Sequence, residues 1–466
     1  MADAQALPRA RGRPGDPRRL REAPSLRWWL RHQLWIPPVL GALLGACLGV
    51  LFVNQTLPVP VVLKGVAWRA TASEARSMLS SVLGIALTSL SIVLSLSMLV
   101  MQNAAGQYSP RLLRLYLHSA GIRVVLPVFV ATSVFCLVAT HAFGFVSGLE
   151  RVPRPALALA MLLLIVCEGA LIFQVLQTLQ LMRVENLVRQ VRRDTLDTAR
   201  TLERFRSSDI EAAAPVRARG ETLGRVWPLH APEDGFIASV DAGALLEVAT
   251  AHRLTIHLER AVGEPVTHGE EMGWLEAPAG EPSWHESTEA LVCRAIHLDR
   301  WRDADRDLAL GVRQLVDVAI KALSPGINDP YTAVEAVDQL TFLLCGLSRM
   351  RLGARVLADA SGVPRVFLHG LALRDYLALA TDQILRYGAT EPAVVLRLLR
   401  LAASVAQRAR DAEDRRAARE WLRSILATSE RTQPNAPETA LLRSHAEALE
   451  QALAGEPWPP LPAIGF

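Results

Sequence analysis

SMLSSVLGIALTSLSIVLSLSMLVMQNAAGQYSPRLLR, the segment Ser77 to Arg114, is the stretch that decides the fold. No charged side chain occurs between Leu79 and Met101. About 20 apolar residues in a helix suffice to cross the hydrocarbon core of a bilayer. The sequence therefore predicts a transmembrane helix that ends before Pro110, where an amphipathic segment begins.

Small and hydroxylated residues recur in this helix at alternating spacings of four and three, which place them on one side of it. One heptad further on, a glutamine lies at the membrane surface. We call this set the hydroxyl face: Ser77, Ser81, Gly84, Thr88, Ser91, Ser95 and Gln102. Two interpretations stay open, because such residues either let helices pack closely or line a path for ions and water.

Three more apolar runs, residues 34–53, 122–146 and 155–182, are long enough to span a membrane. Together with the central helix they predict a four-helix transmembrane bundle over residues 34–182. Residues 1–33 are rich in Arg and Pro and predict a disordered basic tail. A lipoprotein signal ending at Cys47 is the weaker alternative, because the apolar run continues past that cysteine.

The net charge of +4 arises from arginines in the tail and directly after the last span. This distribution favours contact with a lipid bilayer over nucleic acid. Cytoplasmic loops are enriched in Lys and Arg. Both termini are therefore predicted to be cytoplasmic.

Glu168 is the acidic residue within the predicted fourth span. Ionisable groups at that depth usually face a partner or a water-filled cavity. Two interpretations stay open: a neutral side chain hydrogen-bonded to a neighbouring helix, or a functional acid.

The soluble part divides into three regions. Residues 183–224 predict a helical stalk and linker, with a four-three apolar spacing from Val184 to Leu202 that suggests a coiled coil. Residues 225–280 alternate in the manner of strands and predict a small β barrel or sandwich. Their cadence resembles the biotinyl and lipoyl carrier fold, but no lysine lies between Arg225 and Trp301. We therefore predict no such cofactor.

Residues 281–466 predict a cytoplasmic α-helical bundle, with helix returning from Arg294 to Ser324. Asp303, Asp305 and Asp307 do not fit a calcium loop, because Leu308 stands where the loop needs Gly. A solvated helix start explains them better. The sequence therefore predicts no metal site.

The helix stops at SPGINDP, residues 324–330, where Asp329 and Pro330 are suited to begin the next helix. Several polar groups meet here, and we call them the polar corner: Lys321, Ser324, Asn328, Asp329, Tyr331 and Thr332. A structural corner is the favoured interpretation, and a ligand site is the alternative.

Three features of the sequence are typical of one family: four amino-terminal spans, QYSPR at Gln107–Arg111 and ALSPGINDP at Ala322–Pro330. In these features the chain resembles a family of uncharacterised bacterial predicted membrane proteins, grouped as a domain of unknown function. The resemblance implies this architecture and an inner-membrane location. It implies no catalytic residues, since the family brings no established activity.

Three classes of function remain. An oligomeric channel- or transport-like protein with a cytoplasmic regulatory domain is favoured by the hydroxyl face. A membrane-anchored sensor or assembly protein is the alternative, because the soluble part is large enough to bind a ligand or partner. An enzyme is disfavoured, since neither a GxSxG, an HExxH nor a nucleotide-binding glycine loop occurs. A hydrolase using Asp329 and Lys321 is the remaining enzymatic alternative.

Overall fold

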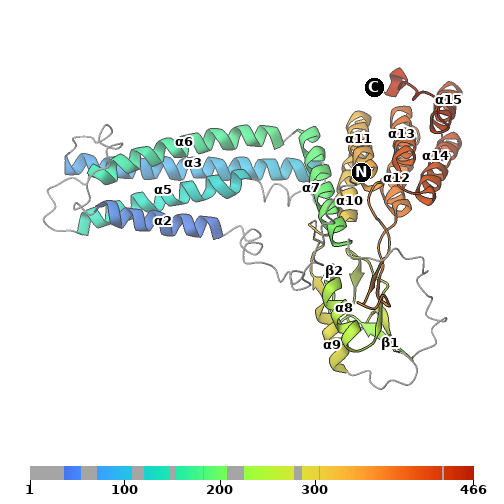
Figure 1. Cartoon of the computed structure of the whole chain (residues 1–466). Coiled ribbons are helices and arrows are strands. Elements are labelled where there is room, and N and C mark those ends of the chain that lie inside the picture. Colours follow the sequence, from blue (N-terminus) through green and yellow to red (C-terminus); the bar gives the residue numbers. More distant parts are fainter. Residues whose placement is uncertain are drawn as a thin grey trace, which may run out of the picture. The chain divides into compact units, whose positions relative to one another are not determined.

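The computed structural model describes residues 36–53, 71–107, 120–145, 154–181, 183–206, 225–277, 286–303, 305–432 and 435–465 (Figure 1). The predicted basic tail and Tyr108–Arg111 of the QYSPR motif lie outside these residues. The chain forms two compact units, which are described separately. One holds Thr198–Leu310 and Met350–Asp375, and the other holds the amino-terminal helices together with Gly311–Arg349 and Tyr376 onward.

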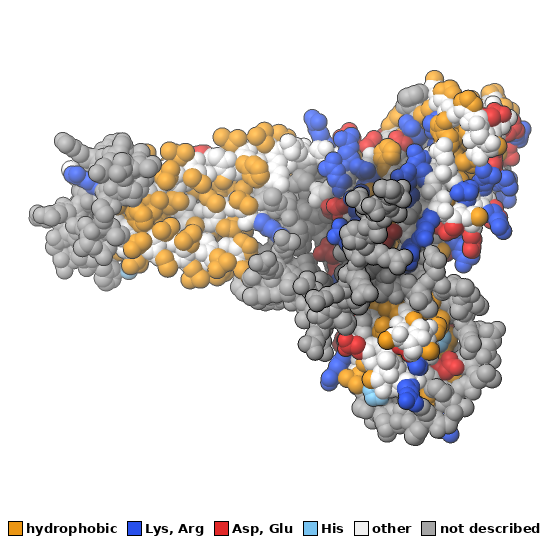
Figure 2. Space-filling view, viewed as in Figure 1, with side chains coloured by type: hydrophobic (Ala, Val, Ile, Leu, Met, Phe, Trp, Pro, Cys, Tyr) orange, Lys and Arg blue, Asp and Glu red, His pale blue; other side chains and the backbone are white. Residues whose placement is uncertain are grey.

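Four helices are long and apolar enough to cross a membrane: α2 (Ile36–Val53), α3 (Ala72–Gln107), α5 (Ala120–Phe145) and α6 (Arg154–Leu181). They coincide with the four predicted spans. Hydrophobic side chains cover their outer surface in Figure 2, as expected of helices whose solvent is lipid.

Helix α5 contacts each of the other three membrane helices. It packs most closely on α2, through Gly41, Gly45 and Gly49, which lie four residues apart. A Cβ atom added at Gly41 would lie 2.6 Å from the Pro127 carbonyl oxygen, and one at Gly45 would collide with the carbonyl of Ala131. These glycines therefore let the two backbones meet, as small residues do between membrane helices.

The unit that holds Thr198–Leu310 and Met350–Asp375 contains two β-sheets that share one core. The five-stranded sheet is mixed, and the three-stranded sheet is antiparallel. The first has the order β1-β5-β3-β8-β7 and the second β4-β2-β6. The strands are β1 (Arg225–His230), β2 (Gly235–Val240), β3 (Thr255–Leu258), β4 (Pro265–Val266), β5 (Glu271–Ala277), β6 (Ile296–Asp299), β7 (Arg355–Ala358) and β8 (Pro364–Leu368), with helices α8 (Ala242–Ala251) and α9 (Glu286–Arg294) between them.

These sheets do not end at the predicted boundary near residue 280. Strand β6 pairs with β2, so the predicted helix from Arg294 to Ser324 begins only at Leu308. Strand β8 pairs in parallel with β3, with Ile256 opposite Val366. Buried His257 of β3 stacks between Trp274 and Phe367, with ring centroids 4.7 and 4.5 Å away, and so joins three neighbouring strands.

The remaining helices are α10 (Leu308–Ala322), α11 (Pro330–Leu347), α12 (Leu373–Gly388), α13 (Pro392–Arg408), α14 (Ala412–Thr432) and α15 (Ala436–Leu453), followed by the 3₁₀ turn η6 (Ala463–Gly465). Helix α13 is buried on nearly all sides and contacts α11, α14 and α15. The predicted helical bundle is thus present, built around α13.

Helix α7 (Val184–Phe205) covers the predicted stalk. A side chain added at Gly311 of α10 would collide with Thr195, and one added at Gly346 of α11 would lie 2.6 Å from Leu196 Cδ2. The apolar face of α7 is therefore occupied by helices of the same chain. This packing, rather than a coiled coil between chains, explains its four-three spacing.

Candidate functional site

The hydroxyl face lies on the outside of the four membrane helices. Its members are exposed, whereas the opposite side of α3, with Leu79, Val82 and Ala86, is buried against the bundle. The Ser81 and Thr88 hydroxyls donate to main-chain carbonyls four residues earlier, at 2.8 and 2.9 Å. Their oxygen atoms still point away from the bundle and can accept further hydrogen bonds.

Glu168 also lies on the outer surface, in the middle of α6. Its neighbour Cys167 is fully buried and donates to Thr132 of α5, with Sγ 3.2 Å from Oγ1. In the described part of the chain, the Glu168 carboxyl has no hydrogen bond. The interpretation that pairs it with a neighbouring helix of the same copy is therefore not met.

A polar contact between α3 and α6 shows how these two features align. Gln174 Nε2 donates to Ser97 Oγ at 3.3 Å. Helices α3 and α6 are the second and fourth of four successive spans, so in an alternating bundle they run in the same direction (Figure 1). Ser91 and Glu168 each precede this contact by six residues, which places them at the same depth, about 9 Å away along the axis. The contact of Gln174 was not predicted from the sequence, because a single amide does not interrupt an apolar run.

The polar corner is held together by helix-capping contacts. Asp329 begins α11: one of its carboxylate oxygens accepts from the Thr332 N–H at 3.1 Å and the other from the Thr332 hydroxyl at 2.6 Å. The Ser324 hydroxyl donates to the Lys321 carbonyl at 2.6 Å. Asn328 adopts a φ of 50°, a left-handed conformation that asparagine tolerates well.

These contacts account for Ser324, Asn328, Asp329 and Thr332 without a ligand. Lys321 and Tyr331 are exposed. Within the described residues no ion pair joins the Lys321 ammonium to Asp329, whose carboxylate accepts from Thr332.

A cleft of about 400 Å³ lies one to three turns further along α11, against α7. We call it the α7–α11 cleft, and its lining residues are Arg189, Arg192, Glu335, Asp338, Gln339 and Phe342. The Arg192 guanidinium lies over the Phe342 ring, 5.6 Å from its centroid. Burial, together with Arg193 and Arg189 nearby, lowers the pKa of Arg192. Burial raises the pKa of Asp338, opposed by Arg397 at 3.5 Å.

Two polar atoms of the α7–α11 cleft are buried without a hydrogen-bond partner. They are Arg192 Nε and Gln339 Oε1. Gln339 as a whole is only 5% exposed. Gln339 Nε2 donates to Glu335 at 3.2 Å, so the side-chain carbonyl of Gln339 is the group that has no hydrogen-bond partner. The cleft was not predicted from the sequence, because polar residues at these spacings are also typical of a solvated helix face.

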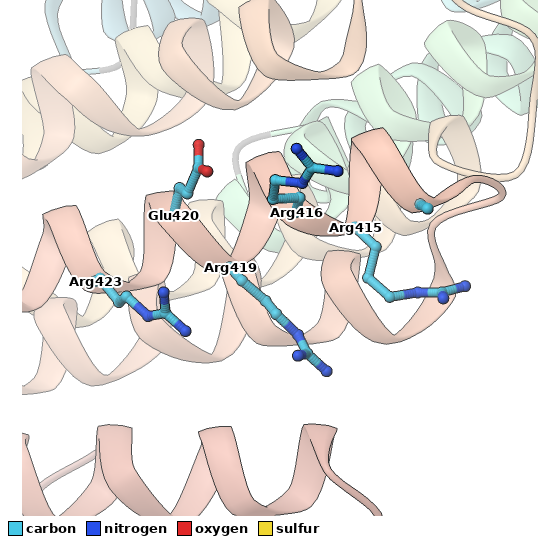
Figure 3. Close-up of a pocket in the computed structure, with 6 residues that line it drawn as sticks. Arg415, Arg416, Arg419, Glu420 and Arg423 are labelled. Atoms are coloured by element: carbon cyan, nitrogen blue, oxygen red, sulfur yellow. The ribbon is translucent and has the colours of Figure 1, made fainter.

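A second hollow, on α14, has a structural explanation. Arg415 and Arg419 project to one side of α14, and Arg416 and Glu420 to the other (Figure 3). Arg415 donates to the Ala409 carbonyl at the end of α13, and Arg419 to the Leu453 carbonyl at the end of α15. Arginines often satisfy carbonyls at helix carboxyl ends in this way.

No group of His, Cys, Asp or Glu suited to a metal ion occurs within the described residues. Of Asp303, Asp305 and Asp307, which the sequence places at a solvated helix start, Asp307 is buried. It accepts from Arg302 Nε at 2.6 Å and from the Leu310 N–H at 3.0 Å, and so caps α10.

The chain resembles proteins that carry no assigned activity. It is 29% identical over 406 residues to uncharacterized proteins of Mycobacterium tuberculosis and Mycobacterium bovis, covering 86% of this chain and 77% of each relative. No solved structure matches it. The family model described as predicted membrane protein (DUF2254) matches residues 31–404. This match covers most of the chain, which also has four helices long and apolar enough to cross a membrane, and it shows that the chain belongs to the DUF2254 family of predicted membrane proteins.

Proposed function

We propose that the protein is a homo-oligomeric, channel- or transport-like protein of the bacterial inner membrane, in which the α3 helices of neighbouring copies line a path across the bilayer. The observation that carries this proposal is the outward position of the hydroxyl face and of Glu168. Both would face lipid in an isolated copy.

Exposure to lipid is unfavourable for these groups. A charged side chain at the centre of a membrane helix costs about 2.5–3.5 kcal/mol on insertion scales. Association of several copies would remove Glu168 from lipid. Ser91 lies at the same depth on the adjacent α3 and is also exposed, so it too would lose its contact with lipid where copies associate.

A dry interface and a water-filled path would both cover the hydroxyl face. The proposal favours a path, because the hydroxyl face continues from Ser77 to Gln102, the full length of the span. A packing motif needs only part of that length. Hydroxyl oxygens along a pore can also replace water around a permeating ion.

Thiol labelling tests this path. Cysteine placed at Thr88 or Ser91, with the native cysteines replaced, should react with a water-soluble reagent in membranes at least about tenfold faster than cysteine at Leu87 or Leu94. Those two control positions are equally outward, 50% and 51% exposed, but flank the hydroxyl face. Equal inertness at all four positions would identify the hydroxyl face as a dry packing surface and rule out the path.

Orientation is tested separately. We expect both termini in the cytoplasm, because arginines cluster before the first span and again from Arg183 to Arg193. Reporter fusions after Val146 and after Arg204 should report opposite sides of the membrane. The same side for both fusions would contradict the four-span topology.

A membrane-anchored sensor is the second candidate function. It is favoured by the α7–α11 cleft, which opens on a helix that begins three residues after the last span. A cytoplasmic part that binds a ligand there could act as the regulatory domain of a transport protein, or signal by itself.

A further inference from the structure

The α7–α11 cleft has the volume of a small-molecule site, and its lining is open and mostly charged. Pockets for small ligands typically measure about 300–1,000 Å³ and present a few convergent polar groups. At about 400 Å³ this cleft is at the lower end of that range. It suits a compact ligand.

The lining carries both signs of charge on facing helices. Arg189 and Arg192, three residues apart on one face of α7, lie opposite Glu335 and Asp338 on α11. No ion pair within 4.0 Å connects the two sides in the described structure. Asp338 pairs instead with Arg397 of α13, and one oxygen of Glu335 accepts from Gln339. The Arg189 and Arg192 guanidinium groups and the other Glu335 oxygen are therefore the charged groups that a molecule in the cleft would meet.

The unsatisfied atoms specify what such a molecule must offer. Gln339 Oε1 is a buried acceptor, so the ligand needs an N–H donor at that side, next to the Glu335 carboxylate. Arg192 Nε is a buried donor, so the ligand needs an anionic oxygen at the other. A buried polar group without a partner costs about 1–3 kcal/mol, which a ligand making both bonds would recover.

We propose that the α7–α11 cleft binds an aminophosphate, a molecule in which a short chain joins a phosphate to an ammonium group. The phosphate accepts from Arg189 and Arg192, since guanidinium groups match phosphate oxygens in geometry. The ammonium donates to Gln339 Oε1 and to the Glu335 carboxylate, while Asp338 keeps its ion pair with Arg397. A simple anion would meet the Glu335 carboxylate without an ammonium to neutralise it.

This chemistry has two sources, free ethanolamine phosphate and the headgroup of phosphatidylethanolamine. The inference is independent of the proposed transport path, because no residue of the cleft belongs to a membrane span. Titration of the full-length protein in phosphatidylcholine nanodiscs with ethanolamine phosphate measures the soluble source. Native mass spectrometry of the protein released from phosphatidylethanolamine-containing nanodiscs measures retained lipid.

Variants identify the site. Arg192→Gln and Gln339→Leu should each weaken the binding of whichever molecule the native protein binds, ethanolamine phosphate or phosphatidylethanolamine. The loss should be at least about tenfold, as expected for a hydrogen bond to a charged group. Arg193→Gln is the matched control, because Arg193 is an exposed neighbour on α7 that does not line the cleft, and it should bind like the native protein. Gln339→Leu removes both a buried unsatisfied carbonyl and the Gln339–Glu335 hydrogen bond, two effects of opposite sign. Its thermal midpoint should therefore stay close to the native value, which separates lost binding from lost folding.

Three results would overturn the proposal. The first is that neither ethanolamine phosphate nor phosphatidylethanolamine binds to the native protein. The second is that Arg192→Gln and Gln339→Leu bind as tightly as the native protein. The third is that inorganic phosphate binds as tightly as ethanolamine phosphate, since the acidic side of the cleft would then have no role.

Discussion

Gly45→Leu should prevent the membrane helices from packing, with a loss of stability of about 3 kcal/mol or more. The added side chain would be directed at the carbonyl of Ala131 in α5, where a Cβ alone already collides with the main chain. Overpacking a core costs about 1–3 kcal/mol when side chains can yield. Here the obstacle is backbone, so α2 and α5 must separate.

The measurement is the yield of monodisperse protein after detergent extraction and its thermal midpoint. Gly169→Leu is the matched control, because a Cβ at Gly169 of α6 meets nothing within 4 Å. The Gly169→Leu protein should therefore unfold at the same thermal midpoint as the native protein. A Gly45→Leu protein that is as stable as the control would show that α2 does not pack on α5 through its glycines.

Asp307→Ala should destabilise the β-sheet unit by about 3 kcal/mol or more. The carboxylate is 2% exposed, and it both pairs with Arg302 and caps α10 through the Leu310 N–H. Removing one partner of a buried ion pair typically costs about 3–5 kcal/mol. Arg302 is 30% exposed, so water can reach it and the lower end of that range applies.

Chemical denaturation followed by tryptophan fluorescence measures this loss, since Trp274 of the same unit is 2% exposed and stacks on His257. Asp307→Asn should lose less, because an amide oxygen can still cap α10. Asp305→Ala changes an exposed acid of the same motif and should stay within about 0.5 kcal/mol of the native protein. Equal stability of Asp307→Ala and Asp305→Ala would show that the cap and ion pair contribute nothing.

The sequence predicted the membrane part well because a single physical requirement, an apolar run long enough for the bilayer, sets each span. It also predicted the start of α11, where Asp329 and Pro330 act locally. It did not predict that β6, β7 and β8 join the sheets. These strands have four or five residues each, and their partners lie far away in the chain.

The candidate sites show the same division. Periodicity was enough to place the hydroxyl face on one side of α3, but not to tell whether that side faced inward or outward. The α7–α11 cleft depends on two helices separated by more than 120 residues, so a local pattern carries no signal for it. The GxxxGxxxG spacing from Gly41 to Gly49 was a readable signal for close packing that the sequence analysis did not use.

The parallel pairing of β3 with β8 affects the order in which the protein can fold during synthesis. Ile256 leaves the ribosome about 110 residues before its partner Val366. At roughly 5–20 residues per second, that delay is on the order of 5–20 s. During this interval β3 can pair with β5 but has one open edge, and open strand edges are sites of aggregation. The nascent chain therefore has a period of several seconds in which we expect its dependence on chaperones to be greatest.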